Sequence, residues 1–446
     1  MASSVGIVLG LGLCSGFGTE ALAGDMPQYS DDKHLGVGEC AGGPCHGSAT
    51  PVGDRVNENE HTIWLRQDPH AEAYKTLLTE ESRAIARNYG LSKPAHESEA
   101  CLDCHADNAV ARGPDLTMEE GVGCEACHGG AERWIKTHTS SQRKHEDNLR
   151  MGMFPTDDPV RRAELCLSCH FGTERRWVNH RMMGAGHPRL RFELDSYQFD
   201  QPKHFVVDDD YTERGKAAVE PVKLWAVGQA VQTRELLRTI ADPKRNRDGI
   251  WPEFAVLDCY TCHHAMQDKR RPTSRISGLG QRPGTPRIND SGFLMLRHIL
   301  EGVSPSAAKK VREGTRRMHA AMSKSEGNRA NVAKDLADLI DSDALPAIAS
   351  WDVGASSIQR IAVSLIDEGL DNQYADYPSA EQAAVALQSL ADTLNGLRPF
   401  TRNEMNGINA CLQDLLQATR DGDLFQTRAG GFTGALNCAK GFLSRD

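Results

Sequence analysis

The stretch Gly121-Val-Gly-Cys124-Glu-Ala-Cys127-His128-Gly129 contains the pattern Cys-x-x-Cys-His, which decides how the rest of the chain is interpreted. This pattern occurs four times in the first two-thirds of the 446 residues. It is the attachment signature of c-type haem, in which both thiols add to porphyrin vinyl groups and the histidine ligates the iron. The other three copies are Cys101-Leu-Asp-Cys104-His105, Cys166-Leu-Ser-Cys169-His170 and Cys259-Tyr-Thr-Cys262-His263.

A looser match precedes these four motifs. In Cys40-Ala-Gly-Gly-Pro-Cys45-His46, four residues separate the cysteines instead of two. Gly and Pro favour a tight turn, so both sulfurs can still reach the vinyl groups. The alternative is a short-loop disulfide, but a disulfide gives His46 no role. We therefore expect five covalent haems, or four if this first motif is not used.

The cysteine count agrees with this interpretation, because ten of the thirteen cysteines lie in the five motifs. Zinc is the main rival for paired Cys-x-x-Cys motifs, but it does not require a histidine directly after every second cysteine. Iron–sulfur clusters are disfavoured for the same reason. The remaining cysteines are Cys14, Cys411 and Cys438. In an oxidising compartment, we expect Cys411 and Cys438 to form a disulfide.

The N-terminus predicts export. Residues 5–18 are apolar, and Ala21-Leu-Ala23 is typical of a cleavage site, so residues 1–23 are interpreted as a signal peptide of a periplasmic or otherwise exported protein. No later stretch approaches eighteen apolar residues, so no transmembrane segment is expected in the mature chain. The net charge of −10 argues against a nucleic-acid partner, which requires basic stripes.

The pattern of apolar residues predicts a mainly α fold with two parts. Residues 24–268 are expected to form a loop-rich cytochrome c domain whose core is filled by haem, with one clear helix at 222–240. Residues 269–289 are basic and rich in Pro and Gly, which is typical of a linker. Residues 290–446 are predicted to be a haem-free helical bundle, in which one helical stripe is Leu387, Leu390, Leu394 and Leu397.

The order of motifs in residues 36–175 resembles the cytochrome c-554 family, whose type member is a tetrahaem carrier that accepts electrons from hydroxylamine oxidoreductase. The matching pieces include Trp64 with the following His70-Ala71, the segment 121–129, and His138. The expanded first motif, the fifth motif and the C-terminal bundle depart from the family. The resemblance therefore implies a fold and a redox role, and the family's electron donor is not carried over.

A haem iron has a second axial position, where a histidine favours electron transfer and a vacancy permits ligand binding. Twelve of the 17 histidines lie outside the motifs. The predicted proximal ligands are His46, His105, His128, His170 and His263. The candidate distal ligands are His70 and His138, chosen from the resemblance and their position, then His180 and His187, and His61 as a fifth.

The haem at Cys101, Cys104 and His105 is the candidate for an open position. The resembling family lacks a distal histidine there, and the residues just after the motif include none. The alternative is that a spare histidine from elsewhere in the chain fills the site.

These observations predict an electron-transfer protein that connects a redox protein donor with a redox protein acceptor. The alternative is an oxidoreductase that acts on a small nitrogen or sulfur compound at an open haem. The bundle also allows a third hypothesis, in which the chain is a module of a larger redox assembly.

Overall fold

The structure is a computed structural model that describes residues 26–43, 45–52, 57–140, 142–173, 175–216, 218–247, 252–263, 287–374, 376–420 and 422–444. The predicted signal peptide and the predicted linker up to residue 286 lie outside the described residues.

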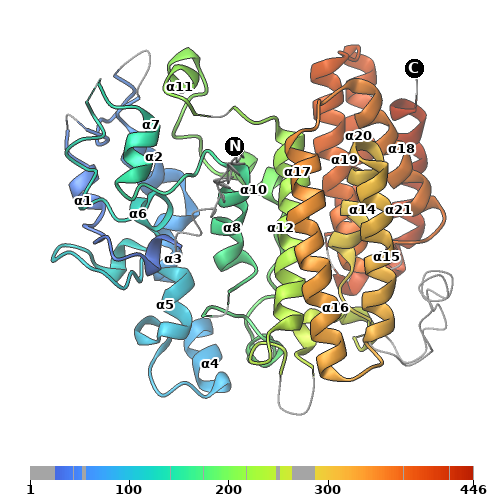
Figure 1. Ribbon diagram of the computed structural model, residues 1–446, viewed down its shortest axis with the longest axis horizontal. Helices are drawn as coiled ribbons and strands as arrows, with labels where there is room; N and C mark the ends of the chain where they lie inside the picture. The colour runs from blue at the N-terminus through green and yellow to red at the C-terminus, as the bar shows by residue number, and fades with distance from the viewer. Residues whose placement is uncertain are drawn as a thin grey trace, which may run out of the picture.

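The first part of the chain consists of short helices joined by loops (Figure 1). Its α-helices are α1 Val37–Cys40, α2 Glu60–Gln67, α3 Ala73–Thr76, α4 Glu80–Tyr89, α5 Glu99–His105, α6 Cys124–His128, α7 His145–Arg150, α8 Pro159–His170, α9 His180–Gly184, α10 Leu194–Asp200 and α11 Asp209–Glu213. Its 3-10 turns are η1 Pro27–Tyr29, η2 Pro69–Glu72, η3 Ala95–Glu97, η4 Met118–Glu120, η5 Phe254–Val256 and η6 Cys259–Thr261.

The second part consists of long helices, and Figure 1 shows them side by side as a bundle. They are α12 Pro221–Ala241, α14 Ser291–Val303, α15 Pro305–Ala321, α16 Glu326–Leu339, the π-helical turn η7 Ile340–Ala344, α17 Leu345–Ala349, α18 Ala355–Leu370, α19 Tyr377–Leu397, α20 Arg402–Ala418 and α21 Gly422–Leu443. The described residues contain isolated β-bridges but no strand. The predicted mainly α fold with a helical C-terminal region is confirmed.

Three of the motifs lie on helices that end at the motif histidine, namely α5, α6 and α8. Helical spacing places the first cysteine, the second cysteine and the histidine, at i, i+3 and i+4, on one face. In α8 the start is fixed by Asp158, whose carboxylate accepts hydrogen bonds from the backbone N–H groups of Val160 and Arg161. The local sequence thus turns both thiols and the imidazole of a motif to the same side.

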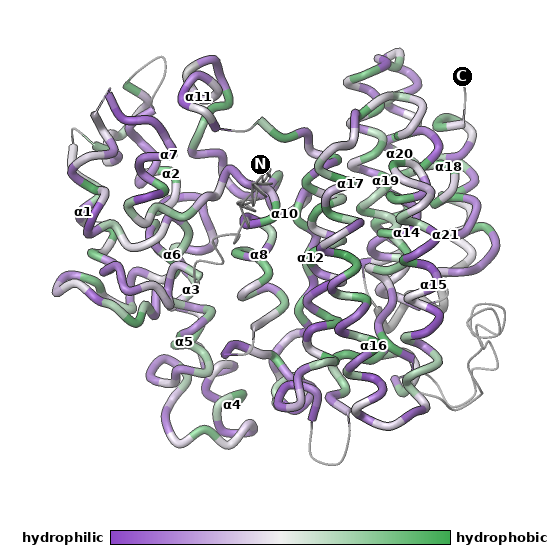
Figure 2. The backbone as a smooth tube through the Cα atoms, in the orientation of Figure 1, coloured by the Kyte–Doolittle hydropathy of each residue, from purple (hydrophilic) through white to green (hydrophobic). Residues whose placement is uncertain are grey.

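Helix α12 joins the two parts and is buried along most of its length. It packs on α8 and α10 on one side and on α14, α16 and α19 on the other, and it stands between the two parts in Figure 1. Gly228 lets α10 approach closely, since an added Cβ would lie 2.7 Å from the Cβ of Leu194. One continuous apolar core therefore runs from Leu167 of α8 into the bundle. Figure 2 shows hydrophobic residues recurring along the bundle helices between hydrophilic ones.

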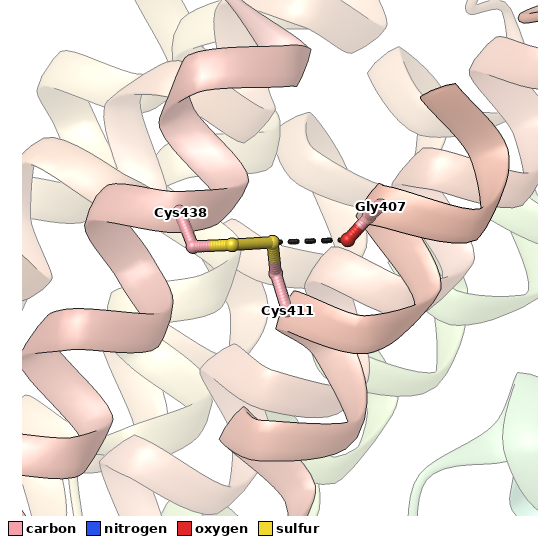
Figure 3. The surroundings of a disulfide bond; sticks show 3 residues. All are labelled: Gly407, Cys411 and Cys438. Atoms are coloured by element: carbon pink, nitrogen blue, oxygen red, sulfur yellow. Dashed lines mark hydrogen bonds between the residues drawn. A yellow bond between two sulfur atoms is a disulfide. The ribbon is translucent and has the colours of Figure 1, made fainter. Parts of the chain in front are cut away.

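The predicted disulfide between Cys411 and Cys438 is confirmed, and it joins α20 to α21 (Figure 3). The two Cα atoms lie 5.7 Å apart, and the sulfur of Cys411 lies 3.1 Å from the carbonyl oxygen of Gly407. Among the described residues, no helix has both the length and the apolar character needed to cross a membrane.

Candidate haem centres

One large cavity in the first part is lined by side chains from four of the five motifs. Its volume is about 1530 Å³, whereas a pocket for one small ligand measures about 300–1,000 Å³. The cavity therefore exceeds the space that a single small ligand needs. The motif residues in its wall are Cys40, Cys45, His46, Cys101, Cys104, His105, Cys124, Cys127, His128, Cys166, Cys169 and His170.

The fifth motif lies outside this cavity wall. Cys259, Cys262 and His263 are all exposed. All ten motif cysteines are free thiols in the structure, so Cys40 and Cys45 are not bonded to one another. Each motif therefore keeps both thiols available for a thioether bond.

Four motif histidines each face one histidine from outside the motifs. The distance alone does not identify a ligand pair, because ordinary aromatic contacts also span about 4.5–7 Å. The informative feature is that each of these histidine–histidine contacts joins one motif histidine to one histidine outside the motifs. The pairs and the distances between their ring centres are His46 with His138 at 6.2 Å, His170 with His70 at 6.2 Å, His128 with His204 at 6.2 Å, and His263 with His180 at 6.1 Å.

These distances fit a metal held between two imidazoles. An imidazole nitrogen binds a transition metal at about 2 Å, and about 1 Å separates that nitrogen from its ring centre, so two rings on opposite sides of one metal have centres roughly 6 Å apart. The residues present therefore fit the iron of a haem at four sites.

Neighbouring acceptors orient several of these rings through Nδ1. The Nδ1 atom of His70 lies 2.8 Å from Asp68 Oδ1, that of His46 lies 2.9 Å from Glu60 Oε2, and that of His138 lies 2.8 Å from the carbonyl oxygen of Ile135. A metal-binding histidine typically donates its second ring N–H to a carboxylate or a carbonyl in this way. In each ring Nε2 remains for the metal.

Burial keeps two of the motif rings neutral. It lowers the pKa of His128 to about 3 and that of His170 to about 4. Because only a neutral imidazole binds a metal, both rings have the protonation state that ligation requires at neutral pH. At Asp68, burial raises the pKa, but the side-chain and backbone hydrogen bonds from His70, the charge of His70 and the hydrogen bond from Gln201 together outweigh burial and lower the pKa to about 2. Asp68 is thus a carboxylate that polarises His70.

The other two candidate distal ligands also line the cavity but lie differently. The ring of His61 packs against Trp64, with 5.7 Å between ring centres. The Nδ1 atom of His187 lies 2.8 Å from the carbonyl oxygen of Pro188. Burial lowers the pKa of His105, the hydrogen bond with Ala73 opposes this, and the charge of His187 adds a smaller lowering effect. His187 is therefore near the second motif. Among the described residues, no histidine ring is stacked or edge-on against His105, whose Nδ1 lies 3.2 Å from the carbonyl oxygen of Ala73.

Sequence reasoning did not select His204, which the structure places opposite His128. His204 lies in a loop after α10, with no motif around it, so histidine abundance is the only signal that pointed to it. His34, by contrast, is a histidine outside the motifs with no ring nitrogen left for a metal. It is buried, and its two ring nitrogens contact Asp107 at 2.8 Å and the carbonyl oxygen of Pro27 at 3.1 Å.

Comparison with known families addresses the same part of the chain. Residues 40–129 match the family model described as cytochrome c554 and c-prime. The predicted resemblance to this family is confirmed over that range, which contains the first three motifs. The match supports a c-type cytochrome that carries haem c and transfers electrons with redox partners. No curated protein and no solved structure matches the chain.

Proposed function

We propose that the protein is an exported pentahaem c-type cytochrome that conducts electrons between a donor and an acceptor protein. The observation that carries this proposal is the set of four histidine pairs, each built on one motif histidine. Two histidines on one iron give a low-spin, six-coordinate centre suited to electron transfer. Four motifs line one cavity wall, so haems attached there would share one enclosure, which supports transfer from one to the next.

The chain supplies attachment, orientation and charge. The ten thiols would hold the porphyrins, and the four histidine pairs would each supply two imidazole ligands to one iron. The bound haem contributes an iron that accepts and releases one electron at a time. Cationic side chains in the cavity wall would attract the haem propionates, and Arg176 among them is buried. The residues in question are Arg143, Arg162, Arg176, Arg214 and Lys216.

A specific observation favours a second function at one site. The second motif has a proximal histidine, His105, but the described residues place no histidine ring against it. An iron there with an open position would bind small ligands, as in an oxidoreductase of a nitrogen or sulfur compound.

Two measurements test the haem count and the export of the protein. The intact mass of the denatured protein is expected to show five covalent haems, and its N-terminus is expected to begin at Gly24. A mass that corresponds to fewer than five haems contradicts the pentahaem assignment. A variant without the two cysteines of one motif then shows whether that motif carries haem, because its mass falls by one haem if it does. An N-terminus that retains residues 1–23 contradicts the cleaved signal peptide.

Carbon monoxide binding to the reduced protein separates the two functions. If the haem at His105 is open, we expect binding to about one haem in five and a high-spin signal in the oxidised protein. A protein that binds no carbon monoxide and is fully low-spin is a pure electron carrier.

A further inference from the structure

The fifth motif is attached to the chain segment that leads into the bundle. Leu257 and Ile288 form an antiparallel bridge. The backbone N–H of Asp258 donates to the carbonyl oxygen of Arg287 at 2.8 Å, and that of Asn289 donates to Val256 at 3.0 Å. The three residues just before Cys259 are therefore paired with residues 287–289, which end just before Asp290, the N-cap of α14.

The side chain of Arg287 continues this connection. Its Nη2 donates to Asp258 Oδ2 at 2.7 Å and to Asp376 Oδ2 at 2.9 Å, and all three side chains are buried. Asp258 directly precedes the motif, and its Oδ2 also accepts a hydrogen bond from Thr261 inside the motif, at 3.2 Å. Asp376 is the N-cap of α19, where its Oδ1 accepts from the backbone N–H of Ser379 at 2.9 Å.

The same end of α19 also holds the segment that carries the opposing histidine. His180 is the first residue of α9, and seven residues after α9 ends, Arg191 lies 3.2 Å from Glu381 Oε1. Arg189 contacts the other oxygen of Glu381 at 2.9 Å. Glu381 lies in the second turn of α19 and is itself hydrogen-bonded by Tyr377 at 2.9 Å.

A third contact joins the two halves of the site directly. The backbone N–H of His180 donates to Glu253 Oε1 at 2.7 Å, and this oxygen also accepts from the backbone N–H of Ala255 at 3.0 Å. Glu253 is buried and is the N-cap of the turn η5, which leads to the fifth motif. The distance between the rings of His180 and His263 thus depends on contacts made by Glu253 and by the start of α19.

We propose that the first turns of α19 support the fifth haem site and that Arg287 is its main positioning residue. This inference rests on the proposed function, because it presumes that the fifth motif carries haem. Without the guanidinium, the two carboxylates of Asp258 and Asp376 would face each other in a buried space, which strongly favours separation. The motif loop would then move away from α19, and the iron would lose its fixed relation to His180. The haem-free bundle acquires a function as the support of one haem.

The test uses the full-length haem protein with Arg287→Gln. We expect the thioether bonds to form, so that the mass still shows five haems, but one low-spin signal in the electron paramagnetic resonance spectrum is lost or shifted. The Cys259→Ser/Cys262→Ser double variant lacks the fifth haem and identifies which signal belongs to it. Arg287→Lys restores a cation between the carboxylates and is expected to recover that signal in large part.

Arg234→Gln is the matched control. Arg234 is 3% exposed, as is Arg287, and it donates to Glu164 at 2.7 Å and to Asp341 at 2.8 Å. Its ion pairs join α12 to α8 and η7. This variant is expected to lower stability while it leaves the signal of the fifth haem unchanged.

Each outcome decides between the hypotheses. A wild-type mass without haem at Cys259 and Cys262 refutes the proposed function at this site. If Arg287→Gln carries five haems and the low-spin signal of the fifth haem is unchanged, only the positioning role is refuted. The positioning role is also refuted if Arg234→Gln loses or shifts the signal of the fifth haem as Arg287→Gln does. If Arg287→Gln does not accumulate, Asp376→Asn is measured instead, because Asn retains the N-cap while it removes the charge. A shifted fifth signal in this variant supports the proposal, and an unshifted one refutes it.

Discussion

Glu125, inside the third motif, offers a sharp test of how the cavity wall is held together. Its side chain is 2% exposed. One carboxylate oxygen accepts hydrogen bonds from the backbone N–H groups of Leu35 at 2.7 Å and Gly36 at 2.8 Å, and the other accepts from Ala131 at 2.7 Å. Glu125 therefore ties the segment before the first motif to the segment after the third.

The substitution Glu125→Ala removes the acceptor of all three bonds. A hydrogen bond to a charged group contributes about 1.5–3 kcal/mol. Burial works in the opposite direction, because it raises the pKa of Glu125 and thus disfavours the carboxylate. We expect the free energy of unfolding to fall by about 4 kcal/mol, a large part of the roughly 5–15 kcal/mol typical of a folded domain.

Urea unfolding of the haem-loaded protein, followed by circular dichroism and haem absorbance, measures this change through the transition midpoint. The control is Glu132→Gln, since Glu132 pairs with Lys33 on the surface at 2.8 Å, and its midpoint is expected to match the wild type. A loss of less than about 1 kcal/mol in Glu125→Ala would refute the reasoning, because it would mean that the three bonds contribute no net stability.

Further predictions concern one ligand, one carboxyl group and the disulfide. His204→Ala is expected to convert one low-spin haem to a high-spin haem, because His204 faces His128; an unchanged spin-state spectrum contradicts the pairing. Burial raises the pKa of Glu193 from 4.5 to about 7, so the unfolded chain ionises first and stability should fall by about 3 kcal/mol as pH rises from about 4.5 to about 7. Urea midpoints across that range should decline less steeply in Glu193→Gln, and equal slopes would exclude the effect. Replacing Cys411 and Cys438 with Ser opens a loop with a sequence separation of 27 and should cost about 3.5 kcal/mol by the chain-entropy model, measured by unfolding without reductant; an unchanged midpoint would show that the disulfide is not a constraint.

The sequence predicts the attachment residues because their chemistry is local. Two thiols and one imidazole must reach the same haem, and the five consecutive residues of a Cys-x-x-Cys-His motif supply all three groups. The opposing ligands are non-local. The resemblance and their position indicated His70 and His138 as candidates, but the position of His204 opposite His128 depends on how the loop after α10 returns to α6. No periodicity of residues encodes such a return.

The helical bundle was predictable for a different reason. Leu387, Leu390 and Leu394 recur with helical spacing, and all three are buried in α19. Leu397 continues the same pattern but is 47% exposed, since it is the last residue of the helix. Helix α12 was expected at 222–240 and spans Pro221–Ala241. Its role as a shared element could not be seen in the sequence, because Gln229, Thr233 and Arg234 are buried in it, whereas polar residues in a helix ordinarily predict an exposed face.

The shared position of α12 has a consequence for the order in which the chain folds. Arg234 pairs with Glu164, 70 residues earlier, and with Asp341, 107 residues later. During synthesis, α12 and the part that contains the first four motifs emerge long before the helices that cover the other side of α12. Loop closure over such separations is slow, and an uncovered apolar helix promotes aggregation. A chain that stops soon after α12 is therefore expected to precipitate even though it contains every haem motif upstream of that helix.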